Sequence, residues 1–222
     1  MTFRKVAPVE WPSGPDEAVT RRDRERVLPG LAGVVLCGGR STRMGVDKAA
    51  ITFEGVTLLE RALARLDSVC DPVFIAAGDV PRPAAGHPFV PDAAPRAGPL
   101  GGLVAALRAS PHRLLAVVAV DLPWIDPRLL QMLAARIGDA GVAVCETSRG
   151  TEPLHAVYST SLLAAAEAAL AGPDRSLRGL IERSKGVRVA ESEWRGVGIA
   201  DSFNWNVNTP DDLAEISRRR PR

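Results

Sequence analysis

Residues 36–48 read Leu36-Cys37-Gly38-Gly39-Arg40-Ser41-Thr42-Arg43-Met44-Gly45-Val46-Asp47-Lys48. The residues that lead into this loop, Leu31–Leu36, are apolar and uncharged, which predicts a short buried strand. Glycines let backbone N–H groups turn toward an anion without interference from a Cβ atom, and arginine and lysine add donors and positive charge. A buried strand that opens into such a loop therefore predicts a cradle for a triphosphate.

The loop does not match two other phosphate-binding motifs. Gly38 and Gly39 are not followed by a third glycine at the spacing of a Rossmann fingerprint. Lys48 has no glycine before it and no serine or threonine after it, as a Walker loop requires. A solvated surface loop is the alternative interpretation, because glycine-rich turns are common after strands.

The composition is that of an ordinary globular chain with one domain, because 46% of its 222 residues are hydrophobic and 24% are charged. A net charge of +2 and an aromatic content of 5% argue against nucleic acid or membrane partners. Cys37, Cys70 and Cys145 are far apart and odd in number, which favours buried thiols in a reducing compartment over a disulfide or zinc site. No segment reads as a membrane helix or signal peptide, so the expected location is the cytoplasm.

We expect one domain, residues 30–218, between two tails. Residues 1–29 contain four prolines and a charge run at 21–26, which predicts a largely disordered segment. A basic docking arm is the alternative for this segment. Residues 219–222 are expected to form a short basic tail.

Strands and helices alternate along the first two thirds of the domain. Periodicity and capping residues predict strands at 31–36, 72–77, 89–90, 113–120, 142–147, 152–158 and 187–190, and helices at 57–69, 99–109, 127–137, 160–170, 177–183 and 210–218. Residues 49–53 are expected to be extended, and residues 191–205 to be irregular. The alternation predicts an α/β fold with three αβα layers and a mainly parallel, Rossmann-like sheet.

Ligands of such sheets bind beyond the carboxyl ends of the strands. Three expected strand ends are candidates: the loop after Leu36, Asp92 and Asp121. Asp121 directly follows the most apolar run, and a carboxylate at this edge suits Mg²⁺, which takes one or two carboxylates, waters and phosphate oxygens. The alternative is that Asp121 caps the next helix, but Asp126 with Pro127 fits the cap better.

The loop at 36–48 resembles the signature LAGGxSxRMGxDK of the nucleotidyltransferases with a glycosyltransferase-A-like, nucleotide-diphospho-sugar transferase fold. Asp121-Leu122-Pro123, the GPLGG at 98–102 and the NVNTP at 206–210 also resemble motifs of these enzymes. Within them the chain is most similar to the molybdenum cofactor guanylyltransferases, over roughly residues 31–217. Cys37 stands where the family usually has alanine, and little consequence is expected because both side chains are small.

This resemblance implies the nucleotide-binding residues. They are Leu36, Cys37, Gly38, Gly39, Lys48, Gly78, Asp92 and Asp121. Asp121 would bind Mg²⁺, and Lys48 would neutralise the triphosphate with Arg43 as a second phosphate ligand, all three being catalytic. Asp47 would orient Lys48 or the loop. The alternative for Lys48 is a position on the surface, and the alternative for Asp92 is an Asx turn. At position 78 this chain has glycine, where the family has asparagine.

The resemblance also implies residues on the substrate side. His155, in the segment Pro153-Leu154-His155-Ala156-Val157-Tyr158, could orient the pterin, and a core histidine is the alternative. Asn206 and Asn208 alternate to one face of an extended segment, where their amides could hold the metal shell or a phosphate. Structural capping before the last helix is the alternative for both.

The implied reaction is Mg²⁺-dependent transfer of GMP from GTP to molybdenum-bearing molybdopterin, with release of pyrophosphate. Proteins of molybdenum insertion and of molybdoenzyme maturation are the implied protein partners. A molybdopterin cytidylyltransferase and a sugar-phosphate nucleotidylyltransferase are alternatives of the same fold. A non-catalytic nucleotide-binding module is a further alternative.

Overall fold

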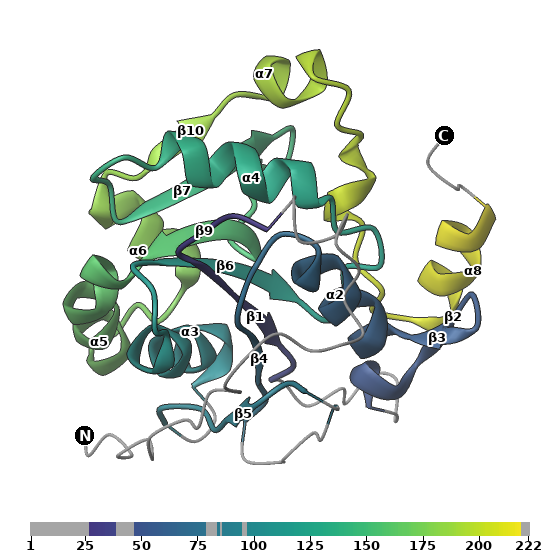
Figure 1. Cartoon of the computed structure of the whole chain (residues 1–222), viewed down its shortest axis with the longest axis horizontal. Helices are drawn as coiled ribbons and strands as arrows, with labels where there is room; N and C mark the ends of the chain where they lie inside the picture. The colour runs from purple at the N-terminus through teal and green to yellow at the C-terminus, as the bar shows by residue number, and fades with distance from the viewer. Residues whose placement is uncertain (1–26, 39–46, 79–83, 85, 95–96, 219–222) are drawn as a thin grey trace.

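A mixed sheet forms the centre of the computed structural model, which describes residues 27–38, 47–78, 84, 86–94 and 97–218 (Figure 1). The strands are β1 (Leu31–Leu36), β4 (Val73–Ala76), β5 (Phe89–Val90), β6 (Leu114–Ala119), β7 (Val142–Thr147), β8 (Gly150–Thr151), β9 (His155–Ser159) and β10 (Val187–Val189). Their order across the sheet is β10-β7-β9-β6-β1-β4-β5, and β8 pairs with β7. A separate small hairpin joins β2 (Thr52–Phe53) to β3 (Val56–Thr57).

Helices cover both faces of the sheet, as the alternation predicted. The α-helices are α2 (Leu58–Asp67), α3 (Gly98–Ala109), α4 (Pro127–Arg136), α5 (Leu163–Ala171), α6 (Leu177–Ser184), α7 (Glu191–Gly196) and α8 (Pro210–Arg218). Helices α2 and α4 contribute to the hydrophobic cluster on one face, and α3, α5 and α6 to the cluster on the other (Figure 1). The three-layer α/β fold is therefore confirmed.

Strand β1 is the centre of the parallel part of the sheet. It is buried along its whole length and runs parallel to β4 on one side and to β6 on the other. The register aligns Leu36 with Ala76 of β4 and with Ala119 of β6. The strands β1, β4 and β6 therefore end at the same edge of the sheet, and the residues that follow them converge there.

Local capping explains where several helices begin. The Thr57 hydroxyl accepts a hydrogen bond from the Glu60 N–H, and the Glu60 carboxylate accepts one from the Thr57 N–H. Asp126 caps α4 by accepting from the Arg128 N–H, as predicted. These contacts satisfy N–H groups that a helix start leaves open.

Two sequence-based expectations about local structure are wrong. Residues 191–205 are not irregular, because they contain α7 and a 3₁₀ helix, η3 (Asp201–Asn204). The Glu193 carboxylate accepts the Ala190 N–H at the start of α7, and the buried Trp194 anchors this short helix to the core. Residues 49–53 are extended only at β2, since Asp47 caps a 3₁₀ turn, η1 (Lys48–Ala50).

The strand expected at 152–158 is shorter and shifted. The chain forms β8, then a turn at 152–154, then β9. Strand β9 is antiparallel to both of its neighbours, β6 and β7, so the sheet is mainly but not wholly parallel.

Three further predictions concern the cysteines, the two ends of the chain and membrane-spanning helices. All three cysteines are buried, as predicted. Leu28 packs against the core and donates its N–H to the Val69 carbonyl, while residues 1–26 and 219–222 lie outside the described residues. Within the described residues, every helix is too short or too polar to span a bilayer.

Candidate active site

A cleft lies at the edge of the sheet where β1, β4 and β6 end. It is lined by Leu36, Cys37, Gly38, Asp47, Lys48, Asp92, Gly98, Pro99, Gly102, Asp121 and four apolar residues, Ala76, Ala119, Val120 and Leu154. The three strand ends singled out in the sequence therefore share one cleft. The converging register of the parallel strands is the physical reason.

Lys48, Asp121 and Asn208 form the polar cluster of this cleft. The Lys48 Nζ atom donates to the Asp121 Oδ2 atom at 2.7 Å and to the Asn208 Oδ1 atom at 2.8 Å. The side chains of Lys48 and Asp121 are 21% and 18% exposed. This partial burial leaves the ion pair accessible to a ligand while it reduces the screening of both charges by water.

Each member of the cluster is held by its own local structure. Asp47 accepts the Ala49 N–H and so begins the 3₁₀ turn that contains Lys48. The Asp121 carbonyl accepts the Val207 N–H at 2.9 Å, which attaches the segment of Asn208 to the end of β6. These contacts fix the cluster on backbone that the sheet edge positions.

Asp212 holds Asn208 from the other side. Its Oδ2 atom accepts the N–H groups of Asn208 and Thr209 at 2.8 and 2.9 Å. These hydrogen bonds lower the pKa of Asp212, and the bond from the Asn208 N–H has the largest effect. This carboxylate is therefore ionised at neutral pH. Thr209 with Pro210 and Asp212 predicts the start of the last helix, and the reciprocal bonds between Thr209 and Asp212 agree with it; the hold on Asn208 is additional.

The donor set fits a divalent metal ion at Asp121. The Asp121 Oδ1 atom is buried and has no hydrogen-bond partner among the described residues. A buried carboxylate oxygen without a partner is costly, and a cation would satisfy it. The described residues hold no group of three His, Cys, Asp or Glu side chains suited to a metal, so waters and ligand oxygens would have to complete the shell, as is usual for Mg²⁺.

Asp92 organises the opposite wall of the cleft. Its Oδ1 atom accepts the Gly78 N–H at 3.0 Å, and its own N–H donates to the Gly78 carbonyl at 3.0 Å. Gly78 has a φ of +60°, which glycine adopts easily. A Cβ atom on Gly102 would lie 3.4 Å from both Asp92 and Leu36, so α3 packs directly against this wall.

The first turn of α3 faces the same cleft. Gly98 and Pro99 line it, and Ala97 at the N-cap position provides no side-chain hydrogen bond to the helix. The N–H groups of an uncapped first turn and the positive end of the helix dipole favour an anion. This edge of the sheet is therefore suited to phosphate.

The remaining predicted site residues have different positions. Gly39 and Arg43 lie outside the described residues. Asn206 and Asn208 do not share one cavity: Asn208 contacts Lys48, whereas Asn206 lines a second hollow. The structure thus places Asn208 against Lys48 of the first cleft and Asn206 in the second hollow.

His155 is a core residue in this structure and does not line the cleft, contrary to its expected position beside the substrate. Its side chain is fully buried, with the Nε2 atom 3.2 Å from the Asp126 carbonyl and the ring edge-on to Phe203. Strand β9 is buried on both faces between β6 and β7, so this side chain has no path to the cleft. Burial lowers the pKa of His155 to about 4.

This buried histidine predicts a loss of stability in mild acid. Between pH 6.5 and 4 the unfolded chain binds a proton at His155 and the folded chain does not, so stability falls as the pH falls. The full loss is about 3 kcal/mol once the pH is below 4. We expect His155→Gln to flatten the slope of unfolding free energy between pH 6.5 and 4.5, measured by urea titration. His112→Gln, at a partly exposed site, is the matched control, and parallel slopes in all three proteins would contradict the prediction.

Solved structures with the same architecture include a molybdopterin-guanine dinucleotide biosynthesis protein and a 2-C-methyl-D-erythritol 4-phosphate cytidylyltransferase, and this chain shares their fold. Its sequence matches the MobA-like NTP transferase domain over residues 33–189. The chain belongs to this family of enzymes.

Individual relatives agree with this assignment. A probable molybdenum cofactor guanylyltransferase of Methanosarcina acetivorans is 34% identical over 219 residues, 92% of this chain and 95% of that protein. The structure of molybdopterin-guanine dinucleotide biosynthesis protein A from Archaeoglobus fulgidus has a TM-score of 0.72 at 24% identity, over 84% of this chain and 97% of that one. A Mycobacterium tuberculosis protein solved in complex with manganese has a TM-score of 0.63 at 19% identity, over 86% and 99% of the two chains.

Proposed function

We propose that this enzyme transfers GMP from GTP to the terminal phosphate of molybdenum-bearing molybdopterin. In this reaction an oxygen of that phosphate attacks the α-phosphorus of GTP, and the bond to pyrophosphate breaks. The observation that carries the proposal is the Lys48–Asp121–Asn208 cluster beside the end of β1. The guanylyltransferase named among the relatives supports GTP as the nucleotide.

The protein's contribution is positioning and charge stabilisation. Backbone N–H groups of the first loop and of α3 would hold the triphosphate, while Asp92 keeps the turn at Gly78 in place for the nucleoside. Lys48 would neutralise the negative charge that moves onto pyrophosphate. Since the acceptor phosphate is already a nucleophile, a covalent intermediate with the enzyme is unnecessary.

Mg²⁺ is the proposed metal, and the Oδ1 atom of Asp121, which has no hydrogen-bond partner among the described residues, would hold it. When bound, such an ion polarises phosphoryl oxygens and orients them for displacement. The manganese in one structural neighbour is compatible with a divalent site in this fold.

A nucleotide panel tests the proposal. The purified chain is incubated with molybdopterin, Mg²⁺ and one of GTP, CTP, ATP or UTP, and pyrophosphate release is measured. We expect release with GTP that requires molybdopterin and stops when EDTA removes the metal.

Each competing function gives a different result. Preference for CTP would indicate a cytidylyltransferase, and GTP binding without turnover would indicate a binding module. Either outcome would overturn the proposed reaction while leaving the family assignment unchanged.

A further inference from the structure

A second hollow of about 340 Å³ lies next to the Lys48–Asp121–Asn208 cluster. It is bordered by the end of β7 and the turn after it, by α7, by η3 and by α8. Asn206 lines it, and Asn208, two residues further, contacts Lys48. Two residues of backbone span at most about 7 Å, so one ligand can extend from this hollow to the cluster.

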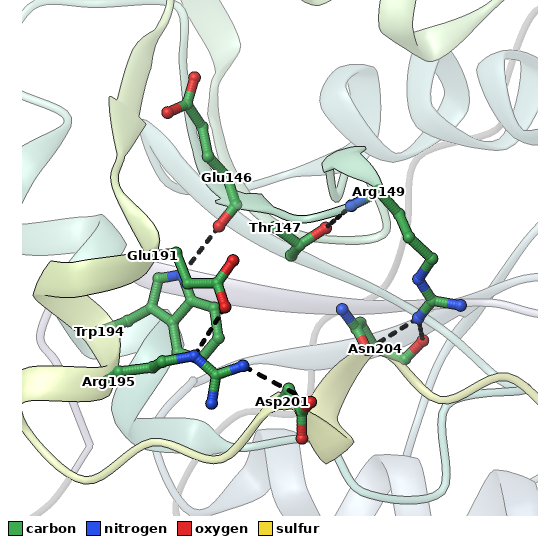
Figure 2. Close-up of polar contacts among 8 residues, drawn as sticks. All are labelled: Glu146, Thr147, Arg149, Glu191, Trp194, Arg195, Asp201 and Asn204. Atoms are coloured by element: carbon green, nitrogen blue, oxygen red, sulfur yellow. Dashed lines mark hydrogen bonds and ion pairs between the residues drawn. The ribbon is translucent and has the colours of Figure 1, made fainter.

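Arg149 provides a fixed positive charge in this hollow. One of its guanidinium nitrogens donates to both the carbonyl and the Oδ1 atom of Asn204, each at 2.9 Å (Figure 2). Both partners are neutral, and Arg149 forms no ion pair within the described residues. Its charge and its remaining donors are therefore available to an acceptor or an anion.

Ion pairs and an aromatic ring form the opposite wall. Arg195 donates to Glu191 at 2.7 Å, lies 3.5 Å from Asp201 and stacks over the ring of Trp194 at 4.8 Å (Figure 2). Trp194 is itself buried and donates its indole N–H to the Glu146 carbonyl at 2.9 Å. Trp194 is therefore fixed in the core, while Arg195 and Asp201 remain half-exposed.

The hollow combines an aromatic ring with carboxylates. The partly buried Trp205 lines it, together with Asp201 and Asp212. The aromatic ring favours a flat ligand, the carboxylates favour N–H donors, and Arg149 favours acceptor atoms. Cavities of this size accommodate ring systems of a few fused rings.

We propose that this hollow binds the fused-ring pterin of the acceptor, with the acceptor's phosphate directed toward Asn208 and Lys48. The pterin is flat and carries an amino group, a ring N–H and a carbonyl, which matches the aromatic, carboxylate and arginine groups of the hollow. This inference rests on the proposed function. It places the pterin against Arg149, which follows β7, and Trp205, which follows α7. It gives the core histidine, His155, no contact with the pterin.

Steady-state kinetics with two variants test the inference. Arg149→Gln removes the charge, and Trp205→Leu removes the aromatic plane while retaining an apolar side chain that can pack. We expect each to raise the KM for molybdopterin roughly tenfold and to leave the KM for GTP within about twofold, because only the pterin contacts are lost. Arg183→Gln is the matched control, since Arg183 is 50% exposed and pairs with Asp174 outside the hollow, and we expect both KM values to stay unchanged.

A binding experiment on the unaltered chain avoids any folding defect of the variants. Equilibrium dialysis with 6-hydroxymethylpterin, which lacks the reacting phosphate, is performed with and without saturating GTP and Mg²⁺. We expect pterin binding to persist in the presence of GTP, because the two ligands occupy different cavities.

The outcomes separate this inference from the proposed function. Unchanged KM values for molybdopterin in active variants, or displacement of the pterin by GTP, would overturn the inference alone. Absence of turnover by the wild-type protein with GTP and molybdopterin would instead overturn the proposed function.

Discussion

Replacing Asp121 with asparagine is expected to lower kcat for pyrophosphate release roughly 10³-fold, because loss of a metal-binding charge removes several kcal/mol of transition-state stabilisation. The Oδ1 atom of Asp121 is the buried carboxylate oxygen in the cleft that lacks a hydrogen-bond partner among the described residues. Asparagine has nearly the same shape and can still accept from Lys48. The fold should therefore survive, and the defect should be confined to catalysis.

The measurement is kcat as a function of Mg²⁺ concentration, with thermal unfolding as a check on folding. Asp139→Asn is the matched control, because Asp139 is an exposed aspartate outside the cleft. We expect Asp121→Asn to require far more Mg²⁺ and the control to behave as wild type. Normal turnover by a folded Asp121→Asn protein at ordinary Mg²⁺ would show that the metal binds elsewhere.

The parts of the fold that the sequence predicted well are those with strong local signals. Leu31–Leu36 is a continuous apolar run that ends at a glycine pair, and it forms the central buried strand. Asp126 with Pro127 signals a helix start in two independent ways, and α4 begins there. Because β1 and β6 are parallel neighbours, the residues that follow them had to meet at one edge, which brought Lys48 and Asp121 together.

The parts that the sequence did not predict depend on tertiary neighbours. His155 belongs to a motif-like segment, but its environment depends on β9 lying between two other strands, and no local pattern encodes that. The alternation of Asn206 and Asn208 predicted a shared face, but Asn206 lines a second cavity. Residues 191–205 show weak periodicity, and the helix there depends on the burial of Trp194.

Replacing Lys48 with methionine is expected to lower kcat/KM for GTP roughly 10²-fold, the usual effect of removing one group that stabilises charge in the transition state. Methionine preserves much of the side-chain length but removes the charge and both hydrogen bonds, to Asp121 and to Asn208. The KM for GTP should rise, because the triphosphate loses a cation in the ground state as well. The KM for molybdopterin should change less if the pterin lies in the second hollow.

Lys185→Met is the matched control, since it removes one positive charge at an exposed position after α6. The double variant Lys48→Met/Asp121→Asn provides the more stringent comparison. Because the Nζ and Oδ2 atoms are 2.7 Å apart, the two side chains belong to one unit, and their effects on kcat/KM should not multiply. If the two effects multiplied, Lys48 and Asp121 would act independently and would not form one unit. If Lys48→Met left nucleotide affinity unchanged, Lys48 would be only a surface partner of Asp121, and the triphosphate would have to lie against other groups of the cleft.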